Sequence, residues 1–245
     1  MDTPRVLLVE DDPLLRRFVR MALEELPLQL LECDGVPAAL EILAGTQVQL
    51  IITDLMLSGA SGVDLLQYLQ RTPALLAQAR TMVLSAGLTP EVRAKLAPLN
   101  VWRMLSKPVS LQLLEDSVME ALNDAPPADS AAPPPPANPP APDDQHAADT
   151  YFAGDLELFH SYRAACLLQF PHDIQAGNAA CAPLDLPALR RVAHSLKSVL
   201  QTLGYADLSA QAWAVENLCH TGQAEPALQG WSGLRAQLQV LVSPA

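Results

Sequence analysis

The sequence predicts two folds in one chain: an α/β domain built on a doubly wound parallel sheet, followed by an all-α, four-helix up-down bundle. Two observations predict this. In residues 1–123, short apolar runs alternate with amphipathic segments, whereas residues 150–245 keep a helical periodicity and show no convincing strand. Residues 124–149, between the two patterns, differ in composition from both. We therefore predict domains at 1–123 and 150–245, joined by a linker at 124–149.

Composition narrows the class of protein. A chain of 245 residues with 50% hydrophobic content can form two ordinary cores. The net charge of −12 argues against a nucleic-acid-binding surface. The chain has no apolar run near the ~20 residues that span a bilayer, and its N-terminus lacks the pattern of a secretion signal. The four cysteines show no metal-binding spacing, so we expect reduced thiols in a cytoplasmic protein without a membrane segment.

In the first domain, five strand-like runs alternate with five helical patterns. Asp12-Pro13 is a typical helix start, with a capping carboxylate followed by proline in the first turn. Repeated strand-helix pairs require a parallel sheet that is covered on both faces. Strands are expected near 6–9, 28–32, 48–53, 81–84 and 101–105, and helices near 13–25, 36–44, 62–71, 90–97 and 110–123.

The segment 124–149 has the composition of a linker. Nine of its 26 residues are proline, five are aspartate, and none is lysine or arginine. Such a segment cannot bury enough apolar surface to offset the entropy lost on ordering. We therefore expect an extended, acidic linker.

Four helices are expected in the second domain, separated by clear boundary residues. Asp185 precedes the second helix, Gly204 follows it, Gly222 follows the third and Glu225-Pro226 opens the fourth. Short connections make neighbouring helices antiparallel, which gives an up-down bundle. The helices are expected near 155–181, 186–203, 206–220 and 224–242.

Polar residues follow several of the predicted strands at the point where each strand ends. The parallel arrangement brings these ends to one edge of the sheet, where ligands bind in α/β folds. The run Ile51-Ile52-Thr53 ends at Asp54, and the first strand ends at Glu10-Asp11-Asp12. The last two strands are followed by Ser85 and by Ser106-Lys107. Five residues are therefore expected to converge: Asp11, Asp12, Asp54, Ser85 and Lys107.

This combination of groups suits phosphoryl transfer. Crowded carboxylates cannot all stay ionised without a cation, and hard oxygen ligands with room for water favour Mg²⁺. One carboxylate can attack phosphorus while Mg²⁺ and the lysine neutralise charge on the phosphoryl oxygens. Taken singly, Asp12 could be a helix cap, Lys107 a surface charge and Ser85 a turn residue. Their convergence is what favours a site.

These residues resemble the receiver domain of two-component response regulators. The resemblance rests on Glu10-Asp11-Asp12, Asp54, Ser85-Ala86 and Lys107-Pro108, and it covers residues 4–123. It implies a flavodoxin-like (βα)₅ fold and Asp54 as the acceptor of a phosphoryl group from a phosphohistidine. It also implies Mg²⁺ bound directly by Asp12, Asp54 and the Met56 carbonyl and, through water, by Asp11. Ser85 and Lys107 should contact the acyl phosphate, and the Lys107-Pro108 peptide is often cis in the family.

One departure from the family and one alternative enzyme class bear on this interpretation. The family has an aromatic residue three positions before the lysine, where this chain has Met104, so the usual switching is in question; Trp102 is a candidate substitute. Haloacid-dehalogenase-type phosphatases also pair a nucleophilic Asp with Mg²⁺ and a lysine. They need a second Asp two residues after the nucleophile, where this chain has Met56, which cannot transfer a proton.

A second candidate site lies on the helix near 186–203. Its apolar residues form one stripe, and we expect His194, Lys197 and Ser198 on the opposite, solvent-facing side. An exposed imidazole is a competent nucleophile toward an acyl phosphate, and a lysine one turn away can stabilise the transferring group. Around His194-Ser195-Leu196-Lys197-Ser198, the chain resembles a histidine phosphotransfer (HPt) domain, whose pattern has glycine where this chain has Ser198.

The two resemblances together indicate a phosphorelay protein. The chain has no Walker-type nucleotide loop, so we expect a stoichiometric phosphoryl carrier rather than an enzyme. Its expected partners are a sensor histidine kinase and receiver domains of other two-component proteins. Three hypotheses stay open at this point: a relay or sink, a binding module in which the receiver controls access to the HPt domain, and an inactive receiver that only localises a working HPt domain.

Overall fold

The computed structural model describes residues 3–123 and 144–243. The chain divides into two compact units, an α/β unit at the N-terminal end and a helical unit at the C-terminal end. This confirms the predicted fold classes and their order. Residues 124–143, most of the predicted linker, lie outside the described residues.

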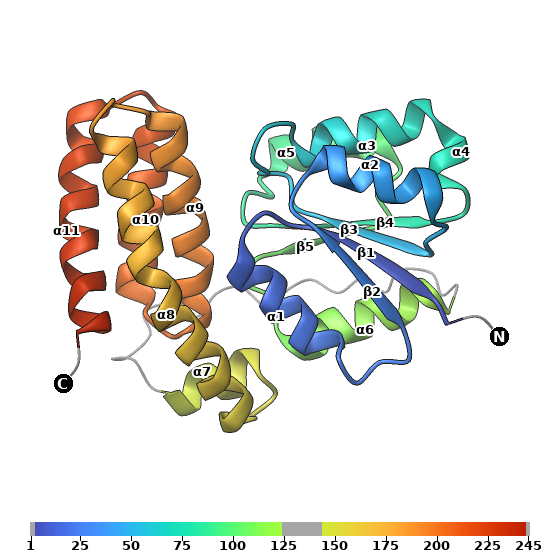
Figure 1. Cartoon of the computed structure of the whole chain (residues 1–245), viewed down its shortest axis with the longest axis horizontal. Coiled ribbons are helices and arrows are strands. Elements are labelled where there is room, and N and C mark those ends of the chain that lie inside the picture. The colour runs from blue at the N-terminus through green and yellow to red at the C-terminus, as the bar shows by residue number, and fades with distance from the viewer. Residues whose placement is uncertain (1–2, 124–143, 244–245) are drawn as a thin grey trace. The chain divides into compact units, whose positions relative to one another are not determined.

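The first unit is built on a five-stranded sheet in which every neighbouring pair of strands is parallel (Figure 1). The strand order β2-β1-β3-β4-β5 is that of a doubly wound sheet. Val9 pairs with Thr53 and Ser85 pairs with Ser106, so the carboxyl ends of these strands lie level along one edge. The strands are β1 (Arg5–Val9), β2 (Gln29–Cys33), β3 (Leu50–Thr53), β4 (Arg80–Ser85) and β5 (Arg103–Ser106).

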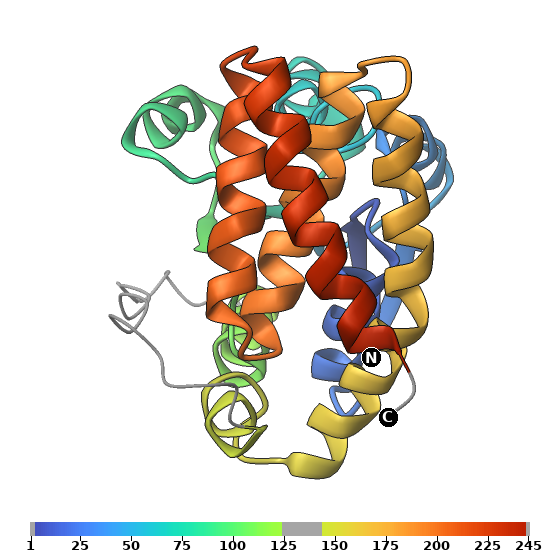
Figure 2. The same cartoon turned by 90° about the vertical axis from the view of Figure 1, so that its left-hand side faces the viewer.

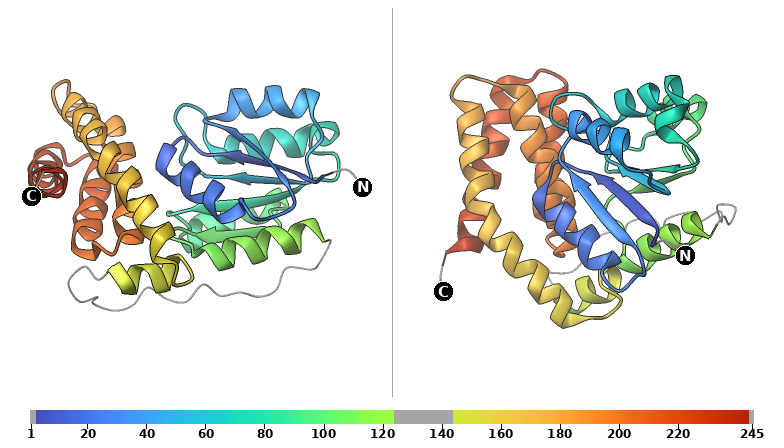
Figure 3. Two further views of the ribbon diagram at one scale, coloured as in Figure 1. Left: turned by 60° about the horizontal axis from the view of Figure 1, so that its bottom comes forward. Right: turned by 45° about the vertical axis from the view of Figure 1, so that its right-hand side comes forward.

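Helices cover both faces of this sheet. In Figures 1 and 3, α1 and α6 lie on one face and α2 and α3 on the other. The five predicted helices are confirmed to within a few residues, and the structure adds the short α4 and a 3₁₀ turn, η1. The bounds are α1 (Pro13–Leu23), α2 (Val36–Gly45), α3 (Gly62–Arg71), α4 (Pro73–Leu76), α5 (Pro90–Leu96), η1 (Ala97–Leu99) and α6 (Leu111–Leu122).

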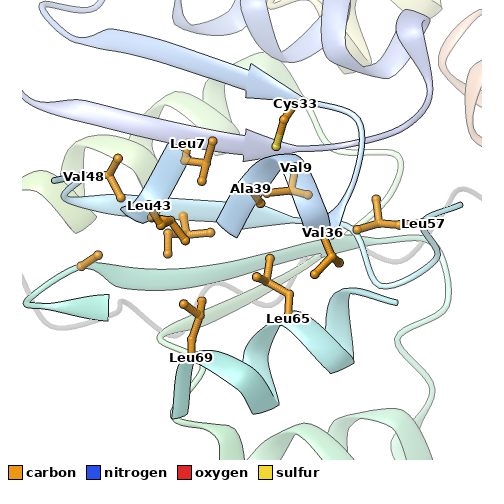
Figure 4. Close-up of a cluster of buried hydrophobic side chains, with 12 residues drawn as sticks. Leu7, Val9, Cys33, Val36, Ala39, Leu43, Val48, Leu57, Leu65 and Leu69 are labelled. Carbon is orange, nitrogen blue, oxygen red and sulfur yellow. The ribbon is translucent and has the colours of Figure 1, made fainter. Parts of the chain in front are cut away.

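The core of this unit explains the continuous apolar runs. A strand covered on both faces has no solvent side, so its residues do not alternate between apolar and polar. Leu7 and Ile51, on β1 and β3, have no exposed surface. In the cluster of Figure 4 they pack with Ala39 of α2 and with Leu65 and Leu69 of α3.

The second unit is a bundle of four long helices (Figure 2). Consecutive helices pack against each other, and the last also packs against the first. The bounds are α8 (Leu156–Cys181), α9 (Leu186–Thr202), α10 (Ala206–His220) and α11 (Ala224–Val242), close to those predicted. None of the helices in the described ranges is long and apolar enough to cross a bilayer.

A further short helix, α7 (Asp144–Tyr151), precedes the bundle and was not predicted. It starts inside the segment assigned to the linker, so that part of the assignment is wrong. Its sequence has few apolar residues, but it packs on α8. The Phe152 ring that follows it lies 5.5 Å from the ring of Phe159 and 5.6 Å from that of Tyr162. Tertiary contact, rather than local periodicity, stabilises this helix.

Two glycines of the bundle give a matched test of packing. A Cβ on Gly177 would lie 2.0 Å from Cζ2 of the buried Trp231 ring, whereas a Cβ on Gly233 would have no neighbour within 4 Å. We expect Gly177→Ala to lower the free energy of unfolding of the bundle by about 1–3 kcal/mol through overpacking. Gly233→Ala should raise it by roughly 0.5–1 kcal/mol, because alanine is the better helix former. Urea unfolding followed by circular dichroism measures both, and equal effects would contradict the packing argument.

Candidate functional site

Asp54 lies at the end of β3, at the carboxyl edge of the sheet. Its backbone N–H donates to the Val9 carbonyl at 3.1 Å, which fixes it beside the end of β1. The residue is 2% exposed, and Oδ1 accepts from the backbone N–H groups of Leu55 at 2.5 Å and Met56 at 3.1 Å. The backbone of Gly62 packs against the backbone of Asp54: a Cβ on Gly62 would lie 1.9 Å from the Asp54 carbonyl oxygen. The tight turn therefore requires glycine at that position.

Lys107 joins two of the buried carboxylates. Its Nζ donates to Asp54 Oδ2 at 2.7 Å and to Glu10 Oε2 at 2.5 Å, and its side chain is 3% exposed. Burial alone would lower the pKa of this ammonium group, but the charges of Asp54 and Glu10 outweigh burial and raise it. The lysine is held at the sheet edge by its backbone N–H, which donates to the Ser85 carbonyl, and the peptide to Pro108 is cis.

Glu10 belongs to this cluster although the sequence analysis did not single it out as a site residue. It directly follows β1 and is 2% exposed. Burial raises the pKa of its carboxyl group; attraction to Lys107 opposes the shift, and repulsion from Asp54 and Asp12 adds to it. The sequence did contain a signal for Glu10: it is the first residue after an apolar strand, as Asp54 is after β3. The cluster thus holds two acids against one lysine.

The other two acids of the Glu10-Asp11-Asp12 run have different contacts. Asp11 Oδ2 accepts from the backbone N–H of Ser58 at 3.0 Å and from its hydroxyl at 2.7 Å. Asp12 Oδ1 accepts from the N–H groups of Leu14 and Leu15, so Asp12 is the N-cap of α1. Asp12 is thus engaged as a helix cap, and its direct contact with Mg²⁺, which the family resemblance implies, stays a prediction.

Ser85 also lies at this edge, as predicted. It is the last residue of β4 and is 1% exposed. Its hydroxyl oxygen has no hydrogen-bond partner among the described residues. A buried hydroxyl without a partner is costly unless a ligand or water satisfies it. The group is therefore available to a ligand at the carboxyl edge.

The acidic residues at this edge have the chemistry of a Mg²⁺ site. Within residues 3–123 and 144–243, no three acidic, histidine or cysteine side chains are already arranged as a cage for a metal ion. The charge balance nevertheless fits a cation, because Glu10 and Asp54 share one lysine and further acids lie nearby. All of these donors are oxygen atoms, which Mg²⁺ prefers.

Trp102, the candidate replacement for the aromatic residue that the family has at the position of Met104, is held in another cluster. Two guanidinium groups lie over the Trp102 ring: the distance from Cζ to the ring centroid is 5.3 Å for Arg80 and 4.7 Å for Arg103. Arg103 in turn donates to Ser117 of α6 at 2.8 Å and to Glu120. Cation–π contacts with the two arginines hold the indole in this cluster. The hypothesis that Trp102 replaces the missing aromatic switch is therefore not supported by its contacts.

His194, on α9, is buried rather than exposed. The side chain is 6% exposed, so the predicted solvent-facing imidazole is wrong. The prediction assumed that only one face of α9 is buried. Because α9 packs against both α8 and α10, a larger part of its surface is buried. The Nδ1 atom lies 2.7 Å from Glu216 Oε1 on α10, while Nε2 has no hydrogen-bond partner among the described residues.

Glu216 was also missed, and it connects the two predicted residues of this site. Its second oxygen, Oε2, accepts from Lys197 Nζ at 2.6 Å. Burial alone would raise the pKa of Glu216, but the hydrogen bond and charge of His194, together with Lys197, lower it to about 2. The signal in the sequence was the turn at Gly204, which folds α10 back along α9 and brings mid-helix residues of the two helices together.

Ser198 differs from its predicted place as well. It is 2% exposed, and its hydroxyl has no hydrogen-bond partner among the described residues. The prediction that Ser198 faces solvent is therefore wrong. Lys197, with 15% of its side chain exposed, lies at the rim of the site.

Two curated proteins each resemble about half of the chain. Over 122 residues, or 50% of this chain, it is 37% identical to the sensor histidine kinase TmoS of Ectopseudomonas mendocina and covers 12% of that protein. Over the same length it is 29% identical to the response regulator protein PilR of Pseudomonas aeruginosa and covers 27% of it. The chain thus spans about an eighth and about a quarter of these relatives.

Solved structures resemble a similar share of the chain. A sensor protein from Polaromonas sp. JS666 is 29% identical, with a TM-score of 0.46, over 50% of this chain and 98% of that one. The phosphorylated cyanobacterial phytochrome response regulator RcpA is 21% identical, with a TM-score of 0.47, over 51% of this chain and 97% of that one.

Two family matches cover both units. Residues 6–119 match the response regulator receiver domain, and residues 161–243 match the Hpt domain. The first match contains Asp54 and Lys107, and the second contains His194 and Glu216. The chain therefore contains a response regulator receiver domain followed by an Hpt domain.

Proposed function

We propose that this protein carries phosphoryl groups in a phosphorelay, on Asp54 of the receiver domain and on His194 of the Hpt domain. One observation supports this above the others. The chain holds both a buried carboxylate bonded to a lysine and an imidazole whose Nε2 is without a hydrogen-bond partner among the described residues. These are the two kinds of group that exchange phosphate in such a relay. Both matched domains are phosphotransfer modules, and we infer that they act as stoichiometric carriers of the phosphoryl group.

At the receiver domain, Asp54 is the nucleophile. An oxygen of its carboxylate forms a bond to phosphorus while the N–P bond of a phosphohistidine donor breaks, and the electron pair returns to the donor imidazole. Lys107 stays close to Asp54 Oδ2 and balances negative charge on the phosphoryl oxygens. We propose that the Ser85 hydroxyl, which has no hydrogen-bond partner among the described residues, donates to one of those oxygens.

We assign Mg²⁺ to Asp11, Asp54 and the Met56 carbonyl, with Glu10 beside them, and retain Asp12 as the helix cap. When bound, the cation supplies positive charge to the transferring group. The four acidic residues are the reason to expect it. Direct coordination by Asp12, which the family resemblance implies, remains a prediction alongside this assignment.

At the Hpt domain, His194 accepts the group from an aspartyl phosphate of a receiver domain, or returns it. The partners are then a sensor histidine kinase and receiver domains of other two-component proteins, and the location is the cytoplasm. We propose that the receiver domain spans residues 1–123. Because α7 packs on α8, we place the start of the Hpt unit at residue 144 rather than 150.

Radiolabel transfer tests the proposal. Purified sensor kinases are autophosphorylated and offered to the full chain, to Asp54→Ala and to His194→Ala. We expect alkali-labile label to be lost in the first variant and alkali-stable label in the second. If neither variant changes any transfer, the relay is excluded. If Asp54→Ala changes only the affinity for a partner, the receiver is instead a regulated binding module.

Removal of the cation separates the two sites. In EDTA we expect labelling of Asp54 by acetyl phosphate to fall at least about 100-fold, because charge on the phosphoryl oxygens is then no longer neutralised. Labelling of His194 by phosphoramidate should not change, since no metal ligand is assigned there. Equal loss at both residues would contradict the assignment of Mg²⁺ to the receiver domain alone.

A further inference from the structure

We propose that the hydroxyl group of Ser198 donates a hydrogen bond to the phosphoryl group on His194, which makes Ser198 a catalytic residue of the Hpt domain. This inference rests on the proposed function of His194. The family pattern has glycine at the position of Ser198, so it gives no side chain at that position a part in the transfer.

Ser198 and His194 lie on the same face of α9, one helical turn apart. Residues four apart in an α-helix are neighbours on its surface, with their Cβ atoms about 5–6 Å apart. The Cα–Cβ bonds of a helix also tilt toward its N-terminus. The Ser198 side chain therefore leans toward the turn that carries the imidazole.

The Ser198 hydroxyl does not make the bond that a helical hydroxyl commonly makes. Serine and threonine inside helices often donate to the carbonyl four residues earlier. Thr202, on the same helix, donates in this way to the Ser198 carbonyl at 3.0 Å. Ser198 is 2% exposed, yet its own hydroxyl has no hydrogen-bond partner within residues 3–123 and 144–243. Because a buried hydroxyl without a partner is costly, this group is available to a ligand.

A second buried polar atom in the same state lies on this face. The imidazole of His194 is 6% exposed, and its Nε2 atom makes no hydrogen bond with the part of the chain that the structure describes. A phosphoryl group carried on this ring satisfies both atoms. The nitrogen forms the N–P bond, and the Ser198 hydroxyl donates to one of the phosphoryl oxygens.

The hydroxyl supplies a donor in addition to the neighbouring lysine. Lys197 Nζ already donates to Glu216 Oε2 at 2.6 Å, so its positive charge is shared with a carboxylate. During transfer the N–P bond forms, the P–O bond to the donor aspartate breaks, and the electron pair of that bond goes to the aspartate carboxylate. The serine keeps its proton throughout. Its hydrogen bond to a charged phosphoryl oxygen is stronger than one between neutral groups.

Reactivity is tested on the full chain with phosphoramidate, a small donor that needs no docking surface and releases ammonia. We expect His194 to be phosphorylated about 10-fold more slowly in Ser198→Ala and in Ser198→Gly than in the wild type, because a hydrogen bond to a charged group is lost. The glycine variant is the sharper test, since it restores the residue of the family pattern and leaves the most space. Ser232→Ala removes a hydroxyl from an exposed position of α11 and should react at the wild-type rate. The phosphohistidine signal is followed by ³¹P NMR.

Urea unfolding of the unphosphorylated protein separates this role from a structural one. Ser198→Ala removes a buried hydroxyl that has no partner in the described ranges, and alanine is the better helix former. We therefore expect the unfolding midpoint of the bundle to stay the same or to rise, while the rate of phosphorylation falls. A fall in both would show that the hydroxyl stabilises the fold, and it would overturn the proposed role.

The outcomes also separate this inference from the proposed function. If wild-type His194 takes no phosphoryl group, the proposed function fails. If the wild type reacts and both Ser198 variants react at least as fast, the function stands and the role of the hydroxyl fails. If Ser232→Ala slows the reaction as much as Ser198→Ala, the effect does not come from the site and the role is rejected.

Discussion

Replacement of Lys107 by methionine is expected to lower the free energy of unfolding of the receiver domain by about 3–5 kcal/mol, because two buried carboxylates lose their shared positive partner. Glu10 and Asp54 are each 2% exposed, and Lys107 Nζ bonds to both. Methionine keeps the length and the apolar part of the side chain, so the loss reports the charge rather than a cavity. Urea unfolding in EDTA, where no cation can compensate, is the measurement.

Two further variants isolate the cause of this effect. Lys95→Met removes a lysine from an exposed position on α5 and should change the unfolding free energy by less than about 0.5 kcal/mol. Combining Glu10→Gln with Lys107→Met should recover part of the loss, since a glutamine at position 10 needs no proton to stay neutral once its positive partner is gone. No recovery in the double variant would show that Lys107 stabilises the domain by packing rather than by charge.

Because of Glu216, the free energy of unfolding of the Hpt domain is expected to depend on pH in the acidic range. Its pKa is about 2 in the folded protein, against an ordinary value of 4.5. A carboxyl group whose pKa is lowered by folding stabilises the folded state above its unfolded pKa, and the contribution is lost as the pH falls from 4.5 toward 2. We expect roughly 2 kcal/mol from this group, allowing for its partial exposure. The groups that face it are His194 and Lys197, with Cys219 also within electrostatic reach.

The pH dependence is measured as the difference in unfolding free energy between wild type and Glu216→Gln. That difference should be largest at pH 5–6 and should shrink steadily toward pH 2.5. Glu225→Gln corrects for the general effect of removing an acid from the bundle, because Glu225 is exposed and makes no such pair of bonds. A difference that stays constant over this range would mean that Glu216 titrates normally in the folded protein.

Much of the receiver site could be predicted from the sequence because it depends on topology. Apolar runs of strand length predict the strands, and parallel pairing brings every strand end to one edge. For this reason Asp54, Ser85 and Lys107 could be expected to converge before any distance was known. The helix boundaries could be predicted equally well, because proline, glycine and capping residues act locally.

The details that decide the chemistry depend on packing between distant parts of the chain. Local pattern cannot tell which carboxylate of Glu10-Asp11-Asp12 meets Lys107, because that depends on how the strand end is oriented against its neighbours. Likewise, periodicity assigned His194 to a solvent-facing side, whereas packing of α9 against two neighbours buries it.

The sequence by itself determined the two folds and their order, because these follow from short-range periodicity, and it supplied the candidate residues for phosphate transfer. Only the tertiary structure decided that Glu10 shares Lys107 with Asp54 and that Glu216 holds both His194 and Lys197. The physical reason is that these contacts join side chains far apart in the sequence, and their directions are set by the packing of whole strands and helices.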